Sequence, residues 1–236
     1  MNIKKYIPNF LTLLNLFCGC ISLVMVSIER FEYAFYFVCL GILFDFFDGF
    51  LARKFGVSGP LGVQLDSLAD MVTSGVVPGF VMVKLFVIQG CFAEIGFYQL
   101  SYLGFLITLG ACYRLAKFNI DVRQSENFIG LPTPANALFI SSLPMVLTVP
   151  DNILIAFFTK IEVLVCITIL SVYVMNAEIP LFSLKIKNFS FAKYKLQIGF
   201  LIASLIMIAA LQFLAVPLII ISYVLLSVVN NMLVKK

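Results

Sequence analysis

Four aspartates lie within a short and otherwise apolar stretch of this sequence. They are Asp45, Asp48, Asp66 and Asp70. An ionised carboxylate at the centre of a membrane helix costs roughly 2.5–3.5 kcal/mol on insertion scales. Four carboxylates so close together require compensation, and a bound cation is the simplest form of it. Carboxylate oxygens suit hard cations such as Mg2+, Mn2+ or Ca2+.

The spacing of the aspartates predicts two pairs on two helices. Asp45 and Asp48 are three residues apart, and Asp66 and Asp70 are four apart, so each pair shares one helix face. A Gly- and Pro-rich connection lets the chain turn back between the pairs. Crossing helices would then present four carboxylates to one point, enough for two ions and for displacement at phosphorus. The same carboxylates also fit the cation or proton pathway of a transporter or channel.

Small and basic residues continue the face of the first aspartate pair. Gly49 and Ala52 leave room there either for a flat nucleotide or for close packing of another helix. Arg53 follows at the helix end, either as an interfacial cation or as a partner of a diphosphate. Near the start of the chain, Asn9 and Thr12 could reach a diphosphate or serve only as a helix cap and a packing contact.

The elements that must position these residues are membrane helices. The chain of 236 residues is 62% hydrophobic and 12% charged, whereas a soluble domain is about 45–50% apolar and about 25% charged. About 20 apolar residues span a bilayer, which predicts an all-α transmembrane helix bundle. The expected eight spans are approximately 9–28, 33–53, 67–88, 98–117, 133–149, 157–177, 196–213 and 215–234. Soft boundaries leave six or seven spans as alternatives.

The basic residues predict the orientation of this bundle. With eight spans, most of the 16 Lys and Arg residues lie on one side, which the positive-inside rule assigns to the cytoplasm. Both termini and the aspartates would then lie at the cytoplasmic face of the cell (inner) membrane. The net charge of +4 has the same origin, and no charge run is dense enough for nucleic acid binding. Because the chain contains no His, acid–base chemistry falls to carboxylates, Lys, Tyr or Cys.

The aspartate stretch resembles the signature of the CDP-alcohol phosphatidyltransferase family. It fits D-x2-D-G-x2-A-R-x8-G-x3-D-x3-D at every fixed position, namely Asp45, Asp48, Gly49, Ala52, Arg53, Gly62, Asp66 and Asp70. The resemblance implies transfer of a phosphatidyl group from a CDP-linked lipid to an alcohol, with release of CMP, by a homodimer with a six-helix core. We therefore expect one membrane-embedded domain over 1–236, with the core at about 1–177 and an additional helix pair at about 196–234.

The same resemblance implies roles for the residues of the motif. The four aspartates would surround the metal, Mg2+ or Mn2+, with two ions expected and Ca2+ an option at one site. Asp70 would also act as the general base that takes the proton from the attacking hydroxyl. The CDP site would be lined by Gly49, Ala52, Arg53 and Gly62, and Asn9 and Thr12 are added to it as candidates.

The acceptor alcohol would be selected outside this motif. Residues 7–19, 60–79 and 113–137 resemble the bacterial membrane-type phosphatidylserine synthases, a subgroup compatible with eight spans. This resemblance implies CDP-diacylglycerol and L-serine as substrates, with phosphatidylserine and CMP as products. Serine is a zwitterion, so its carboxylate needs a cation and its ammonium group needs hydrogen-bond acceptors. The candidates are Arg114, Asn119, Arg123, Thr133 and Asn136, each of which could instead serve only as a helix anchor or a solvated loop residue.

Three alternatives remain for the function. Glycerol 3-phosphate or inositol phosphate would need a more cationic pocket than the loop at 117–134 offers, where Lys117 and Arg123 face Asp121 and Glu126. A CDP-linked ether lipid could replace the diacyl donor. Outside the family, the intramembrane aspartates could serve a cation transporter.

Overall fold

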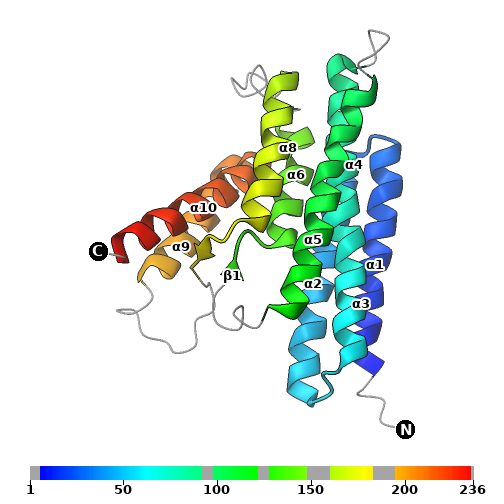
Figure 1. Cartoon of the computed structure of the whole chain (residues 1–236), viewed down its shortest axis with the longest axis vertical. Helices are drawn as coiled ribbons and strands as arrows, with labels where there is room; N and C mark the ends of the chain where they lie inside the picture. Colours follow the sequence, from blue (N-terminus) through cyan, green and yellow to red (C-terminus); the bar gives the residue numbers. More distant parts are fainter. Residues whose placement is uncertain (1–5, 92–97, 122–127, 148–159, 183–194, 235–236) are drawn as a thin grey trace.

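The computed structural model describes residues 6–91, 98–121, 128–147, 160–182 and 195–234, and these form an all-α bundle with one small two-stranded sheet (Figure 1). The predicted all-α class is therefore confirmed. Helices occur in each of the eight ranges expected to span the membrane. Four helical stretches are long and apolar enough to do so, namely Tyr6–Ser27, Phe31–Phe55, Pro60–Gly90 and Leu196–Leu233. The count of eight spans stays a prediction.

The first two helices form a hairpin that leads directly to the aspartates. Helix α1 covers Tyr6–Ser27 and α2 covers Phe31–Phe55, and the two pack along each other. Helix α2 ends at Gly56, whose φ of 64° is in the left-handed region that favours glycine. The N–H of Gly56 bonds to the carbonyl of Arg53, and that of Val57 to Ala52. This cap stops the helix two turns after Asp48 and lets the chain reverse.

The next long helix begins earlier than the sequence predicted. Helix α3 (Pro60–Asp70) starts at a proline. Proline is favoured at the first helical position, because a backbone N–H there would have no partner within the helix. It continues through a π-helical segment, η2 (Met71–Val76), into α4 (Val77–Phe86) and η3 (Val87–Cys91). Asp66 and Asp70 therefore lie well inside a continuous helix. The π-helical segment follows Asp70 directly.

The second half of the bundle contains α5 (Leu106–Ile120), α6 (Thr133–Val146) and α8 (Ile161–Asn176), with the 3-10 helix η4 (Tyr98–Phe105) before α5. Strands β1 (Phe128–Ile129) and β2 (Pro180–Leu181) pair antiparallel, with Phe128 opposite Leu181. Directly after β1 the chain turns at Gly130, which has a φ of 74°. A Cβ there would lie 2.5 Å from the carbonyl oxygen of Met175, so only glycine fits this close approach.

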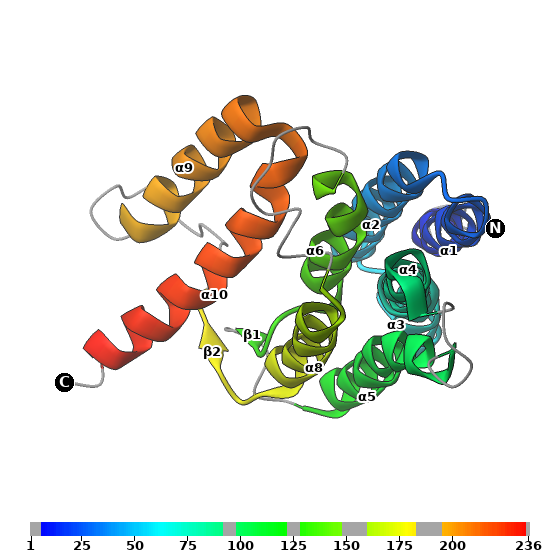
Figure 2. The same ribbon diagram turned by 90° about the horizontal axis from the view of Figure 1, so that it is seen from above.

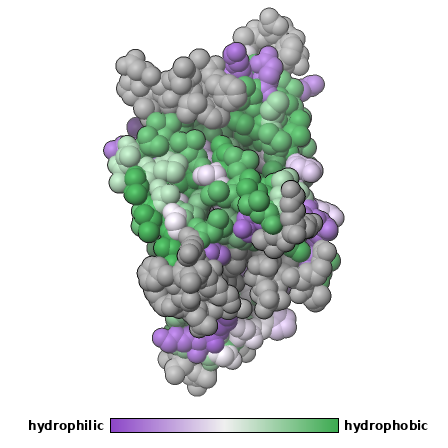
Figure 3. Space-filling view, turned by 90° about the vertical axis from the view of Figure 1, so that its left-hand side faces the viewer, coloured by the Kyte–Doolittle hydropathy of each residue, from purple (hydrophilic) through white to green (hydrophobic). Residues whose placement is uncertain are grey.

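The C-terminal helices lie to one side of the bundle. Helices α9 (Lys195–Leu211) and α10 (Ala215–Val234), joined by η6 (Gln212–Leu214), diverge from α1–α5 when viewed from above (Figure 2). Helix α10 contacts α6 and β2. The face that carries these helices has a broad apolar surface across its middle and upper part (Figure 3), as a lipid-facing surface would.

Candidate active site

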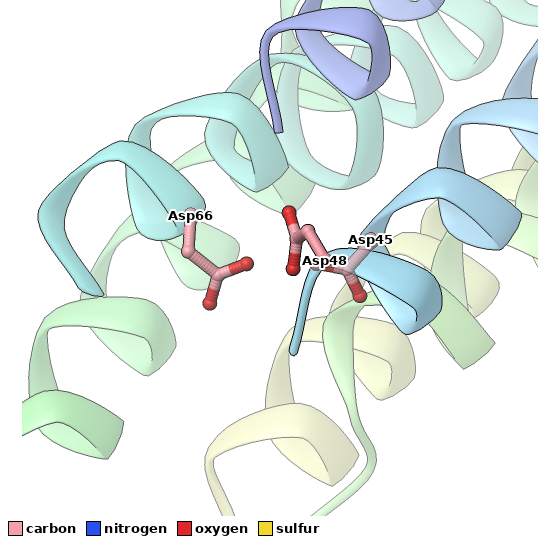
Figure 4. A group of neighbouring side chains, drawn as sticks. All are labelled: Asp45, Asp48 and Asp66. Carbon is pink, nitrogen blue, oxygen red and sulfur yellow. The ribbon is translucent and has the colours of Figure 1, made fainter. Parts of the chain in front are cut away.

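Three of the four aspartates converge in the structure. Asp45 and Asp48 on α2 and Asp66 on α3 each offer a carboxylate oxygen, and these oxygens all lie within 4.8 Å of one another (Figure 4). Asp48 is buried, at 5% exposure, and the other two are partly buried. The turn at 56–59 brings α3 back beside α2, and the three-residue spacing keeps Asp45 and Asp48 on one face. The predicted convergence is thus found for three carboxylates.

Asp70 lies next to this group rather than within it. It is one helical turn beyond Asp66 and is 8% exposed. Its Oδ1 accepts a hydrogen bond of 3.0 Å from the side-chain amide of Asn15. The sequence predicted that all four carboxylates would meet at one point, and the group found within 4.8 Å comprises three of them. The role of Asp70 in metal binding stays a prediction.

Helix α1 supplies neutral partners for both carboxylate positions. It packs against α2 and α3, and Thr12 and Asn15 lie three residues apart on its inner face. The Thr12 hydroxyl is 2.5 Å from Asp48 Oδ2. The backbone carbonyl of Asn15 accepts a bond of 3.1 Å from Thr73, which fixes α1 against η2. Asn15 was not among the site residues predicted from the sequence. Its position one turn after Thr12, as a polar residue in an apolar helix, could have indicated it.

The residues predicted to line a CDP site gather near the turn between α2 and α3. The Arg53 guanidinium folds back over Gly49, since a Cβ on that glycine would lie 3.3 Å from Arg53 Nη1. A Cβ on Gly62 would lie 3.7 Å from Asn9 Oδ1, so Asn9 sits beside this glycine. Ala52 is partly buried on α2. Gly49 and Gly62 therefore leave space next to the polar ends of Arg53 and Asn9.

The donor set fits a divalent cation. All three converging groups are carboxylates, the ligands that hard cations prefer. Within the described ranges, no Lys or Arg nitrogen lies within 4.0 Å of these three carboxylates. The ion pairs found in those ranges are Lys84–Glu29 and Lys117–Glu178. Three clustered carboxylates with no ion-pair partner at that distance repel one another, and a divalent ion would relieve that repulsion.

A buried cation lies on α5, a helix that contacts both α3 and η2. Arg114 on α5 is 5% exposed, and its Nη2 donates a bond of 3.2 Å to the carbonyl of Gly130. No carboxylate of the described residues lies within 4.0 Å of it. A buried guanidinium bonded to a neutral carbonyl keeps most of its donors available for an anion.

The other residues predicted to bind the acceptor fall in different places. Asn119, at the end of α5, donates a bond of 2.8 Å to the hydroxyl of Ser67, the neighbour of Asp66. This contact ties α5 to the aspartate helix. Thr133 and Asn136 are buried in the first turn of α6, where Asn136 Oδ1 accepts a hydrogen bond from Ser171 on α8. Arg123 lies outside the described residues.

Comparison with known proteins finds a family match over most of the chain. The model of the CDP-alcohol phosphatidyltransferase family matches residues 5–182, which include every aspartate above. A protein of Bacillus subtilis named CDP-diacylglycerol--serine O-phosphatidyltransferase is 35% identical over 134 residues, covering 55% of this chain and 70% of that protein. A Helicobacter pylori protein of the same name is 33% identical over 135 residues, covering 56% and 54%.

An archaeal relative carries a different name. The archaetidylserine synthase of Methanothermobacter thermautotrophicus is 34% identical over 151 residues, covering 60% of this chain and 61% of that protein. The names of these relatives share serine and differ in the lipid. The C-terminal helices α9 and α10 lie beyond the region that the family model matches.

Proposed function

Because the chain belongs to the CDP-alcohol phosphatidyltransferase family, we propose that it transfers the phosphatidyl group of CDP-diacylglycerol to the hydroxyl of L-serine, giving phosphatidylserine and CMP. The observation that carries this proposal is the convergence of Asp45, Asp48 and Asp66 within 4.8 Å, at the spacing of the family signature. The names of the relatives supply serine as the acceptor.

The aspartates would hold the metal that the reaction needs. Asp45, Asp48 and Asp66 are the ligands, and Asp70 is the candidate for completing a second site. Mg2+ or Mn2+ fits the all-oxygen donor set, with two ions expected and Ca2+ an option at one of them. When bound, divalent ions neutralise the diphosphate and stabilise the charge of the leaving CMP. Thr12 orients the Asp48 carboxylate through its hydroxyl.

The CDP group would occupy the space next to the turn between α2 and α3. Gly49, Ala52 and Gly62 carry no bulk that would keep a nucleotide away from the two helix backbones. Arg53 is exposed and can swing from Gly49 to a diphosphate oxygen, with the two-pronged geometry that guanidinium offers. Asn9 would donate its amide to the same diphosphate.

Asp70 would act as the general base. Its carboxylate is buried near the metal ligands and is held in place by Asn15 on α1. A fixed carboxylate outside the group of three converging oxygens is available to take the proton of the serine hydroxyl. The deprotonated oxygen then attacks the lipid-side phosphorus, the bond to the CMP oxygen breaks, and CMP leaves.

Serine would be recognised between α3 and α5. Arg114 offers a buried guanidinium for the serine carboxylate, and Gly130 fixes its direction. Asn119 and Thr133 are further candidates, as is Arg123, which lies outside the described residues. A phosphorylated acceptor would need more cations than these residues provide. An ether-linked donor is the second candidate, because one relative is named archaetidylserine synthase.

We further propose that the chain crosses the inner membrane eight times with both termini in the cytoplasm, and that it functions as a homodimer. The distribution of Lys and Arg supports this orientation. The active site would then open to the cytoplasm, where serine and CMP are dissolved. One single domain would extend over 1–236, with α9 and α10 added to the family core.

The direct test is an assay of CMP release by the purified chain. CDP-diacylglycerol and a divalent metal are incubated with serine, glycerol 3-phosphate, inositol phosphate or glycerol in turn. We expect release with serine alone, and phosphatidylserine as the lipid product. Release with a phosphorylated alcohol instead would reassign the acceptor, and no release with any alcohol would favour a transporter. Asp48→Asn, which removes one of the proposed metal ligands, should abolish CMP release. Glu32→Gln, which removes a carboxylate from the opposite end of α2, is its control and should leave release unchanged.

A further inference from the structure

A large apolar cavity lies away from the aspartates, between α6, α8 and α10. Its volume is about 690 Å³. Side chains from all three helices line it, among them Phe139, Leu170, Val174, Ile220 and Val224. An apolar space of this size does not suit serine, a diphosphate or a metal ion, because each of these would lose its hydration without replacement.

One polar group in this cavity lacks a partner. Asn136 is fully buried and lines the cavity from the first turn of α6. Its Oδ1 accepts a hydrogen bond from Ser171, while its Nδ2 has no hydrogen-bond partner among the described residues. A buried amide donor without an acceptor is unfavourable, so the occupant of the cavity should offer an acceptor at this end.

The length of the cavity's lining along α8 matches a single hydrocarbon chain. Its lining along α8 extends from Glu162 to Val174, which at the rise of an α-helix is about 18 Å. One leaflet of a bilayer core is about 15 Å thick, half of the roughly 30 Å total. Asn136 lies at the Val174 end, in the same part of the chain as Gly130 and Arg114. Helix α6, which carries Asn136, also packs against α2 and η2, the elements that carry or adjoin the aspartates.

We propose that this cavity holds one acyl chain of the lipid donor, with Asn136 Nδ2 donating to the ester carbonyl of that chain. The proposal rests on the proposed function, since it takes CDP-diacylglycerol as the donor. It moves Asn136 from the serine site to the lipid site. The hydrocarbon extends along α8 towards Glu162, and the ester stays near the start of α6.

Helix α10 makes this site a feature of the whole chain rather than of the family core. Ile220 and Val224 form one wall, and both lie outside the region matched by the family model. The helix is held against the core by the Tyr223 hydroxyl, which donates to the carbonyl of Phe182 at 2.9 Å, and by Asn231, which donates to Pro180. The C-terminal helix would therefore set the accepted chain length.

Photocrosslinking tests the location independently of turnover. The full chain in lipid nanodiscs is loaded with CDP-diacylglycerol that carries a diazirine midway along one acyl chain, irradiated and digested. We expect labelled peptides from α8 and α10. Labelling confined to α1–α4 would overturn the proposal even if CMP is released. Labelling of α8 and α10 without CMP release from serine would support the lipid site and count against the proposed function.

Two variants add a kinetic test. Val224→Phe fills the cavity, and Leu226→Phe adds the same ring to an exposed position on the same helix. We expect Val224→Phe to lower kcat/KM about tenfold for a dipalmitoyl donor and far less for a dioctanoyl donor, as expected for a filled apolar pocket. Leu226→Phe should change neither value. Equal effects of Val224→Phe on both donors would contradict the proposal.

A third variant tests the ester contact. Asn136→Leu removes the amide donor at similar volume. It should lower kcat/KM for the ester-linked donor while leaving that for an ether-linked donor, which lacks the carbonyl, close to the wild-type value. A similar loss with both donors would show that Asn136 serves only packing and would overturn its assignment.

Discussion

The aspartate region and the Arg114 region are built in opposite ways. Around the aspartates, α1, α2 and α3 bring together side chains of one sign, and their partners are the neutral groups of Thr12 and Asn15. Around Arg114, a single buried cation is bonded to the backbone carbonyl of Gly130. Neither region has a charged partner of opposite sign within 4.0 Å among the described residues.

This contrast indicates what each region binds. Clustered carboxylates with no ion-pair partner could hold metal ions, and a buried guanidinium without a carboxylate could bind an anion. The two regions are joined by the bond between Asn119 on α5 and Ser67 on α3. Cation-dependent chemistry and acceptor recognition would thus be separate functions on adjacent helices, and variants should separate them.

Removal of divalent metal should give the largest effect. EDTA added to the purified protein should abolish CMP release, because three converging carboxylates cannot stabilise a diphosphate leaving group without an ion. Added Mg2+ or Mn2+ should restore it. The Arg114 region should be unaffected by the chelator. Serine binding, measured by calorimetry with and without EDTA, should therefore stay the same. Turnover that survives EDTA would remove the metal from the mechanism.

The next effect should come from Asp70. Asp70→Asn keeps the shape of the side chain and its neighbour Asn15 but removes the base, and we expect kcat to fall about 10²–10⁴-fold. Binding of CDP-diacylglycerol, measured by equilibrium dialysis, should stay close to wild type, because the three converging carboxylates remain. Asp66→Asn is the matched variant on the same helix and should weaken metal-dependent binding as well. Normal turnover by Asp70→Asn would show that the base lies elsewhere.

Much of the aspartate region was predictable because it depends on local geometry. Residues three or four apart share a helix face, so Asp45 with Asp48 was paired correctly from spacing alone. The left-handed Gly56 and the proline at the start of α3 supply the turn that brings Asp66 back. The hydrogen bond that Asp70 accepts from Asn15 of α1 was not predictable, because the two residues are 55 positions apart in sequence.

The Arg114 region was predictable only as a set of candidates. Its partner is the carbonyl of Gly130, which carries no side-chain signal, and the position of Gly130 depends on close contact with Met175 of α8. Asn136 was assigned to serine from its place in the chain, but packing of α6 against α8 and α10 turns it towards an apolar cavity. Such contacts between distant elements leave no pattern in a single sequence.

Arg114 offers a test confined to the acceptor. Arg114→Lys keeps the charge but loses the fork of donors that binds a carboxylate, so the KM for serine should rise about 10-fold or more while the KM for CDP-diacylglycerol changes little. Steady-state kinetics with each substrate varied in turn measures both. Lys117→Met removes a partly exposed cation whose bond to Glu178 is 3.5 Å, and should have a much smaller effect. Equal rises in both KM values for Arg114→Lys would place this residue outside the serine site.

The smallest effect should come from Tyr223, which touches neither region directly. Its hydroxyl donates to the carbonyl of Phe182, next to β2, and β2 pairs with β1 just before Gly130. Tyr223→Phe loses this bond, which is worth about 0.5–1.5 kcal/mol, and loosens the strand that leads to the Arg114 partner. The KM for serine should therefore rise by about threefold or less, with EDTA sensitivity unchanged. Ser222→Ala is the control, because among the described residues the Ser222 hydroxyl bonds within α10, to the carbonyls of Leu218 and Ile219. A change in metal dependence for Tyr223→Phe would mean that the two regions are coupled more tightly than their separate construction implies.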